Sequence, residues 1–94
     1  MHAVRRYRVL GRVQGVGYRA FAWRTAAALG LRGWVRNCFD GSVEVLASAP
    51  AAVLDELEQR LREGPYLSRV DRVEVSEESP NQELGAGFAV RRDA

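Results

Sequence analysis

The sequence predicts an α+β fold in which one antiparallel sheet carries two helices on one face. Segments with alternating polar and apolar residues, typical of half-buried strands, are interleaved with two segments whose apolar residues recur at helical spacing. The chain has only 94 residues, the size of one small domain. We therefore expect residues 1–94 to form a single domain.

The first strand and the first helix are joined by glycines. Arginine-rich and apolar positions alternate over residues 6–13, which predicts a strand. Gln14 to Gly17 breaks this alternation with two glycines. From Tyr18 the apolar residues fall on one helical face, and Gly30 stands where a glycine commonly ends a helix. A helix over about residues 18–29 follows.

The next elements are a hairpin and a second helix. Alternation over residues 32–37 and 43–48, with a turn at Asp40-Gly41 between them, predicts two paired strands. Pro50 suits the first turn of a helix, which Gly64-Pro65 would end. The expected core stripe of this helix is Val53, Leu54, Leu57 and Leu61.

The last third predicts two more strands. Val70, Val73 and Val75 mark the first, and their uneven spacing predicts an irregularity between Val70 and Val73. Residues 77–87 read as a polar loop, and Phe88–Arg91 as a short final strand. The order β-α-β-β-α-β plus an extra C-terminal strand is the ferredoxin-like arrangement. This topology serves enzymes, regulatory domains and RNA binders, so it does not decide function.

Charge is distributed unevenly along the chain. Residues 1–39 hold eight arginines and no acid, whereas residues 40–94 hold six arginines and twelve acids. The first half is therefore expected to attract anions. Cys38 is the only cysteine, and no apolar run has the length of a membrane span or signal peptide. These features favour the cytoplasm. His2 and Cys38 are the only soft metal ligands, so no metal site is expected.

The most informative segment is Gly11-Arg12-Val13-Gln14-Gly15-Val16-Gly17-Tyr18-Arg19. Glycines between a strand and a helix let successive N–H groups point into one concavity, and the helix start adds unpaired donors and its positive dipole end. Arg19, in the first helical turn, can fork onto two oxygens of a phosphate. The segment therefore predicts an anion cradle, although a tight turn without ligand is the simpler interpretation of the glycines alone.

Two motifs resemble those of the acylphosphatase family. The segment from Gly11 to Arg19 resembles its signature, and Gly33-Trp34-Val35-Arg36-Asn37 with Asp40-Gly41-Ser42-Val43-Glu44 resembles its second motif; Phe88-Ala89-Val90 also agrees. The family more often has phenylalanine at the position of Tyr18, whose hydroxyl needs a partner if it is buried.

The resemblance implies metal-independent hydrolysis of acyl phosphates to a carboxylate and inorganic phosphate, with no cofactor. It implies that Arg19 clamps the phosphate and that Asn37 orients the attacking water. The substrate-binding residues would be Gln14, Gly15, Val16, Gly17 and Tyr18, which would hold the phosphate through backbone amides. Inorganic phosphate should inhibit competitively, because the cradle recognises the dianion and not the acyl group. Since the sequence shows no obvious apolar stripe for association, a monomer is expected.

Two alternatives use the same topology. Basic and aromatic residues are interleaved in the first quarter of the chain, which is also typical of RNA-binding domains; they include Arg5, Tyr7, Arg8, Tyr18, Phe21 and Trp23. A regulatory module that binds a small anion without turning it over is the other alternative. Without the resemblance, Asn37 would be read only as a strand-end or turn residue.

Overall fold

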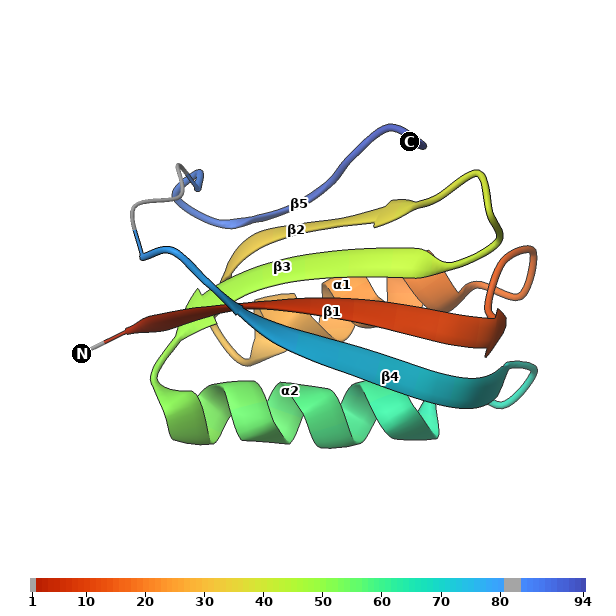
Figure 1. The fold of residues 1–94 in the computed structure, drawn as a ribbon, viewed down its shortest axis with the longest axis horizontal. Coiled ribbons are helices and arrows are strands. Elements are labelled where there is room, and N and C mark those ends of the chain that lie inside the picture. Colours follow the sequence, from red (N-terminus) through yellow and green to blue (C-terminus); the bar gives the residue numbers. More distant parts are fainter. Residues whose placement is uncertain (1, 81–83) are drawn as a thin grey trace.

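The computed structural model describes residues 2–80 and 84–94 (Figure 1). The elements are β1 (Ala3–Arg12), α1 (Tyr18–Ala28), β2 (Arg32–Asn37), β3 (Val43–Ala49), α2 (Ala51–Glu63), β4 (Arg69–Glu78) and β5 (Phe88–Val90). This is the predicted β-α-β-β-α-β order with an extra strand. Both helices pack on the same face of the sheet (Figure 1), as predicted. Neither is long and apolar enough to cross a membrane.

The five strands form one sheet in the order β4-β1-β3-β2-β5. Neighbouring strands are antiparallel except β5, which runs parallel to β2 at the sheet edge. The predicted hairpin is confirmed, because β2 pairs with β3 from Arg32 opposite Ser48 to Asn37 opposite Val43. This pairing places Asn37 at the end of β2, next to the turn.

The predicted bounds of the last two strands need correction. The expectation of a loop from Glu77 was wrong at its start, because Glu77 and Glu78 pair with Arg5 and Val4 of β1. The part of that expected loop at residues 81–83 lies outside the described residues. The final strand ends at Val90 rather than Arg91.

The predicted irregularity between Val70 and Val73 is confirmed. Leu10 pairs with Arg72 but Gly11 pairs with Val70, which leaves Asp71 as an extra residue of a β-bulge. The backbones approach closely here, because a Cβ on Gly11 would lie 2.1 Å from the carbonyl oxygen of Arg69. Gly11 also has φ +136°, so only glycine fits.

The main core lies between the sheet and the helices. It takes Tyr18, Ala22 and Ala26 from α1 and the predicted leucines from α2, with Val53 partly buried beside them. The Tyr18 hydroxyl donates a 2.6 Å hydrogen bond to the carbonyl of Leu61. That carbonyl stands four residues before Pro65, which has no N–H to complete the helical pattern. The phenol therefore satisfies a helix-end acceptor, which is the partner that a buried Tyr18 requires.

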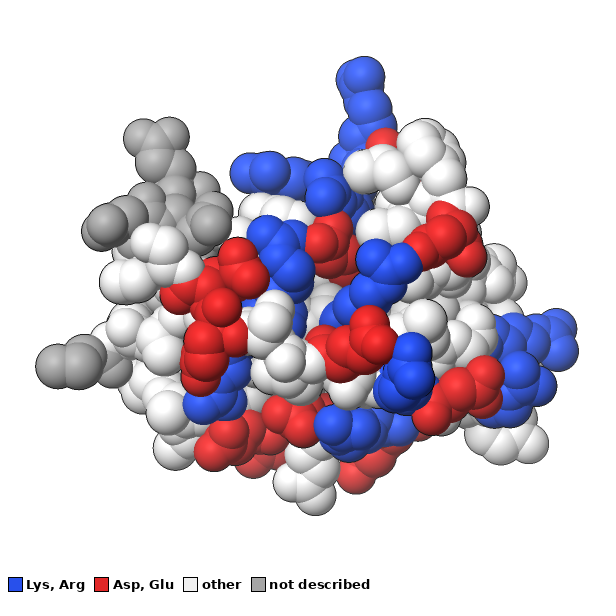
Figure 2. All heavy atoms as spheres, in the orientation of Figure 1, with Lys and Arg blue, Asp and Glu red and all other residues white. Residues whose placement is uncertain are grey.

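The opposite face of the sheet is a mosaic of arginines and acids (Figure 2). In the ranges that the structure describes, five of the eight arginines in residues 1–39 form ion pairs with acids from later in the sequence: Arg5, Arg6, Arg8, Arg19 and Arg36. The positive charge of residues 1–39 is therefore partly neutralised in the folded protein, because the fold brings these arginines beside acids from later in the chain. Trp34 is buried on this face, with Val4 and Leu46.

Candidate active site

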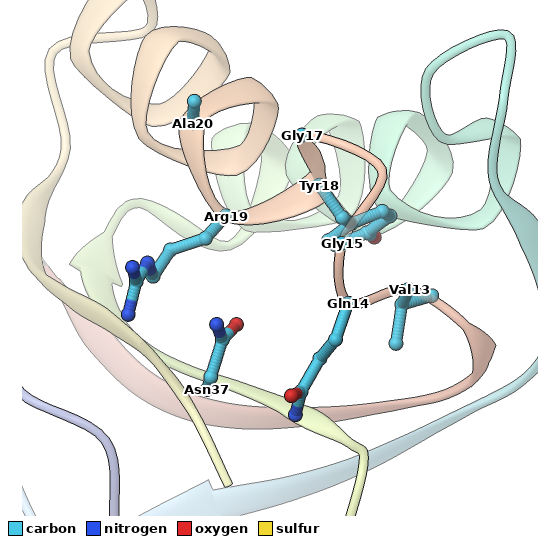
Figure 3. Close-up of a pocket in the computed structure, with 8 residues that line it drawn as sticks. All are labelled: Val13, Gln14, Gly15, Gly17, Tyr18, Arg19, Ala20 and Asn37. Atoms are coloured by element: carbon cyan, nitrogen blue, oxygen red, sulfur yellow. The ribbon is translucent and has the colours of Figure 1, made fainter.

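The loop between β1 and α1 and the end of β2 lie at the same end of the sheet (Figure 1). Residues from both line one cavity (Figure 3). The cavity has a volume of about 210 Å³ and is lined by Val13, Gln14, Gly15, Gly17, Tyr18, Arg19, Ala20 and Asn37. Two residues predicted from different elements, Arg19 on α1 and Asn37 on β2, thus reach the same space (Figure 3). Arg19 is the only charged residue in this lining.

The loop backbone is shaped to present donors. Gly15 and Gly17 have φ values of +75° and +79°, a left-handed conformation that glycine adopts without strain. Gly17 is also the residue that caps α1, and no side chain caps this helix. Among the described residues, no group accepts a hydrogen bond from the backbone N–H groups of residues 14–20. Such an array of free N–H groups at a helix start is suited to bind an anion.

Gln14 connects the loop to the turn that follows Asn37. Its side-chain Nε2 donates to the carbonyl oxygens of Cys38 at 2.7 Å and Ser42 at 2.8 Å. The same turn is closed by Asp40, whose Oδ1 accepts from the N–H and the hydroxyl of Ser42. The Gln14 side chain therefore fixes the two halves of the site relative to each other, and its backbone N–H is the donor that it can offer to an anion.

The other loop residues that were predicted to bind substrate differ in which of their groups face the cavity. Gly15 and Gly17 line the cavity, but Val16 does not, because its side chain packs against the core. Tyr18 lines the cavity with its ring directed into the core, so only its backbone is available to a ligand. Burial raises the pKa of the Tyr18 phenol, so this group stays protonated at neutral pH.

Arg19 is held by a residue that sequence reasoning missed. Its Nη1 lies 2.7 Å from Oδ1 of Asp93, and its side chain is 35% exposed. Seventy-four positions separate the two residues, so no local motif joins them. Val13 and Ala20 also line the cavity without having been predicted.

Asn37 carries an unsatisfied acceptor. Its Oδ1 is the one buried side-chain nitrogen or oxygen atom without a hydrogen-bond partner in the part of the chain that the structure describes. Buried polar atoms are normally paired, and one that is not requires an explanation such as a water or a ligand. Because the Asn37 amide faces the cavity beside Arg19 (Figure 3), a hydrogen-bond donor bound in the cavity would give this Oδ1 a partner.

Two of the four aromatic residues named for the RNA-binding alternative are not available for base stacking. Tyr7 and Tyr18 are fully buried in the core. Phe21 packs against the same core, whereas Trp23 is 40% exposed and its Nε1 donates a 2.8 Å hydrogen bond to the carbonyl oxygen of Phe88. Within the described residues, no group of three or more histidine, cysteine, aspartate or glutamate residues is arranged to hold a metal ion.

A cavity lined by an arginine and free N–H groups, at the first strand-helix junction of a ferredoxin-like sheet, is typical of small phosphate-binding α+β domains. Comparison with known proteins identifies the family within this class. The acylphosphatase family model matches residues 5–90. An acylphosphatase from Koribacter versatilis is 56% identical over 80 residues, covering 85% of this chain and 73% of the relative. One from Azoarcus is 48% identical over 86 residues, covering 92% and 86%.

A solved structure agrees with these sequence matches. The crystal structure of acylphosphatase from Bacillus subtilis superposes with a TM-score of 0.89 at 37% identity and covers 97% of this chain and 99% of that one. The chain belongs to the acylphosphatase family, as its motifs predicted. It is an enzyme with acylphosphatase function, and its substrates are acyl phosphates.

Proposed function

We propose that the free N–H groups of the 14–20 backbone and the guanidinium of Arg19 bind the phosphate group of an acyl phosphate, while Asn37 orients the water that attacks it. The observation that carries this proposal is the convergence of three complementary groups on one cavity: unpaired N–H donors, one arginine and the unpartnered Oδ1 of Asn37. The N–H groups and the guanidinium can donate hydrogen bonds to phosphate oxygens, and the amide oxygen of Asn37 can accept one from a water molecule.

The reaction needs little covalent help from the protein. A water that donates a hydrogen bond to Asn37 Oδ1 keeps a lone pair free to attack phosphorus. Its oxygen forms the new P–O bond as the bond to the acyl oxygen breaks, and the carboxylate leaves with the electron pair. One water proton passes to a phosphate oxygen, which gives dihydrogen phosphate. A carboxylate is a good leaving group, so no general acid is required.

Charge stabilisation supplies the catalysis in this mechanism. Phosphoryl transfer spreads negative charge over the equatorial oxygens and depends mainly on positioning and electrostatic stabilisation. The loop N–H groups and Arg19 are in place before the substrate binds. The left-handed conformations of Gly15 and Gly17 shape the loop, and the hydrogen bonds of the Gln14 side chain hold it. These donors carry the role that a metal ion has in other phosphoryl-transfer enzymes, so the proposal includes no metal or cofactor.

The proposal extends to domain organisation, oligomeric state, inhibition by phosphate, partners and cellular location. Residues 1–94 act as one domain and as a monomer. Inorganic phosphate inhibits competitively, since the cradle recognises the dianion and not the acyl group. Nucleic acid is not a partner, because Tyr7 and Tyr18 are buried. The enzyme works in the cytoplasm, which is supported by the single cysteine.

Hydrolysis of benzoyl phosphate tests the proposed chemistry. The purified full chain should accelerate the reaction in excess chelator as much as in untreated buffer, since no metal takes part. Added inorganic phosphate should raise the KM for benzoyl phosphate and leave kcat unchanged. Loss of activity in chelator, with recovery on adding a divalent metal, would contradict the metal-independent mechanism. Noncompetitive inhibition by phosphate would place the phosphate site elsewhere.

A further inference from the structure

Beyond β5, the chain continues along β2 with one extra residue. The N–H of Arg91 donates to the carbonyl oxygen of Val35 at 2.8 Å, and the N–H of Ala94 donates to that of Asn37 at 3.0 Å. The two acceptors are two residues apart, whereas the two donors are three residues apart. The 91–94 segment therefore contains a one-residue insertion of the kind found in β-bulges, which often re-aim a side chain beside an active site.

The extra residue determines which way Asp93 points. In a regular strand, residues 91 and 93 share a face, and the guanidinium of Arg91 lies 4.9 Å from the Trp34 ring on the face away from the helices. The insertion reverses the alternation after Arg91. The Asp93 carboxylate is instead on the helix side, with Oδ1 2.7 Å from Nη1 of Arg19.

The same segment also holds Asn37. The backbone of Ala94 accepts a 2.7 Å hydrogen bond from Phe39 N–H, besides donating to Asn37. The 91–94 segment thus contacts α1 through the Asp93 side chain and the end of β2 through the Ala94 backbone. Both residues of the proposed site, Arg19 and Asn37, are bridged by one short stretch of chain.

A carboxylate on one edge of a guanidinium leaves the other donors free. Arginine has five N–H donors in a planar fork, and Asp93 engages Nη1. Two phosphate oxygens can still be met by the remaining N–H groups. Fixing the plane of the Arg19 guanidinium before the substrate binds reduces the entropy that is lost on binding. Small errors in the position of such a group lower the catalytic rate considerably.

We propose that Asp93 is a positioning residue for Arg19, directed toward it by the extra residue in the 91–94 segment. It orients the guanidinium for phosphate without contacting the substrate. This inference rests on the proposed role of Arg19 in phosphate binding.

Kinetics of Asp93 variants in the full chain test the proposal. Asp93→Ala should lower kcat/KM for benzoyl phosphate about 10-fold and weaken inhibition by inorganic phosphate, because the fork is no longer held. Asp93→Asn keeps an Oδ1 acceptor and should recover part of the loss. Assays well below the unfolding temperature exclude a general loss of fold. The matched control is Asp55→Ala, which breaks the ion pair with Arg5 outside the cavity lining and should behave as wild type.

The role of the extra residue can be tested separately. Deleting Arg92 restores regular spacing and should turn Asp93 away from Arg19, with the same kinetic loss as Asp93→Ala. Arg92→Ala keeps the spacing and should retain wild-type kinetics. Normal activity after the deletion would show that the insertion does not direct Asp93.

Combination with Arg19→Ala distinguishes failure of this inference from failure of the proposed site. If Asp93 acts through Arg19, Asp93→Ala should have no further effect in the Arg19→Ala background. Wild-type kinetics or tighter phosphate inhibition in Asp93→Ala alone would overturn the positioning role, the latter by showing that Asp93 competes with phosphate. Near-normal turnover of Arg19→Ala would instead overturn the proposed site itself.

Discussion

At the scale of single residues, Arg19 and Asn37 differ in how far the sequence could predict them. The strand-glycine-helix pattern gives Arg19 a physical reason to meet an anion, whereas the importance of Asn37 followed only from family resemblance. The structure adds an independent argument for Asn37. Its buried Oδ1 lacks a partner, and an unsatisfied buried acceptor costs about 1–3 kcal/mol. A bound water that donates to Oδ1 would remove that cost and would stand beside Arg19.

The Tyr18 hydroxyl should contribute to the stability of the protein but not to its activity. Tyr18→Phe should lower the free energy of unfolding by about 1 kcal/mol, because the buried carbonyl of Leu61 loses its donor. The value of kcat/KM should stay unchanged, since the hydroxyl points away from the cavity. Denaturant unfolding and the benzoyl phosphate assay measure the two effects.

Tyr7→Phe is the matched control for this prediction. The Tyr7 hydroxyl donates to the carbonyl of Leu54 at 2.9 Å, but that carbonyl can also accept the N–H of Glu58 within α2. The cost should therefore be smaller than for Tyr18→Phe. Equal stability of wild type and Tyr18→Phe, or a loss of activity in that variant, would contradict the assignment.

At the scale of elements, the sequence predicted helices and strands well where one face is apolar, and less well where charges pair across strands. The end of β4 is the example. Glu77 and Glu78 look like loop residues, but they lie 3.1 and 3.6 Å from Arg5 and Arg6 of the neighbouring strand. Whether a charged residue continues a strand depends on its cross-strand partner. That partner is about seventy positions away and could not be identified from the local pattern.

Glu44 on β3 links three strands and gives a pH-dependent prediction. Its carboxylate accepts from Arg6 of β1 and, at 2.7 Å, from Arg36 of β2. Burial alone would raise the pKa of Glu44, but the hydrogen bonds from Arg36 and Arg6 outweigh it and lower that pKa below 4.5. A lowered folded-state pKa stabilises the protein above the unfolded pKa, and this contribution is lost as the pH falls through the folded value.

Glu44→Gln should therefore lower the free energy of unfolding by about 1–2 kcal/mol at pH 7. The difference from wild type should shrink as the pH falls below 4.5, because protonated Glu44 resembles glutamine. Denaturant unfolding over this pH range measures it. Glu74→Gln breaks an exposed ion pair with Arg72 and should cost less than about 1 kcal/mol. A Glu44→Gln effect that does not change with pH would contradict the argument.

At the scale of the whole molecule, folding rearranges the charge that the sequence separates into halves. Arginines of β1 lie beside acids of β3, α2 and β4, so the surface is a mosaic (Figure 2). We therefore expect anion binding to be concentrated where free N–H groups surround Arg19. The composition could not reveal this, since it does not specify strand register. For the same reason Asp93 could not be linked to Arg19 before the fold was known.

Side-by-side kinetics of Arg19→Ala and Asn37→Ala test the proposed site most directly. The assay measures kcat and KM for benzoyl phosphate and Ki for inorganic phosphate in folded protein, with the exposed Arg24→Ala on the same helix as control. Arg19→Ala should lose activity on the order of 10³-fold and bind phosphate more weakly. Asn37→Ala should lose turnover on the order of 10²-fold and keep its phosphate Ki. Near-normal turnover of Arg19→Ala, or weakened phosphate binding with normal turnover in Asn37→Ala, would contradict the account.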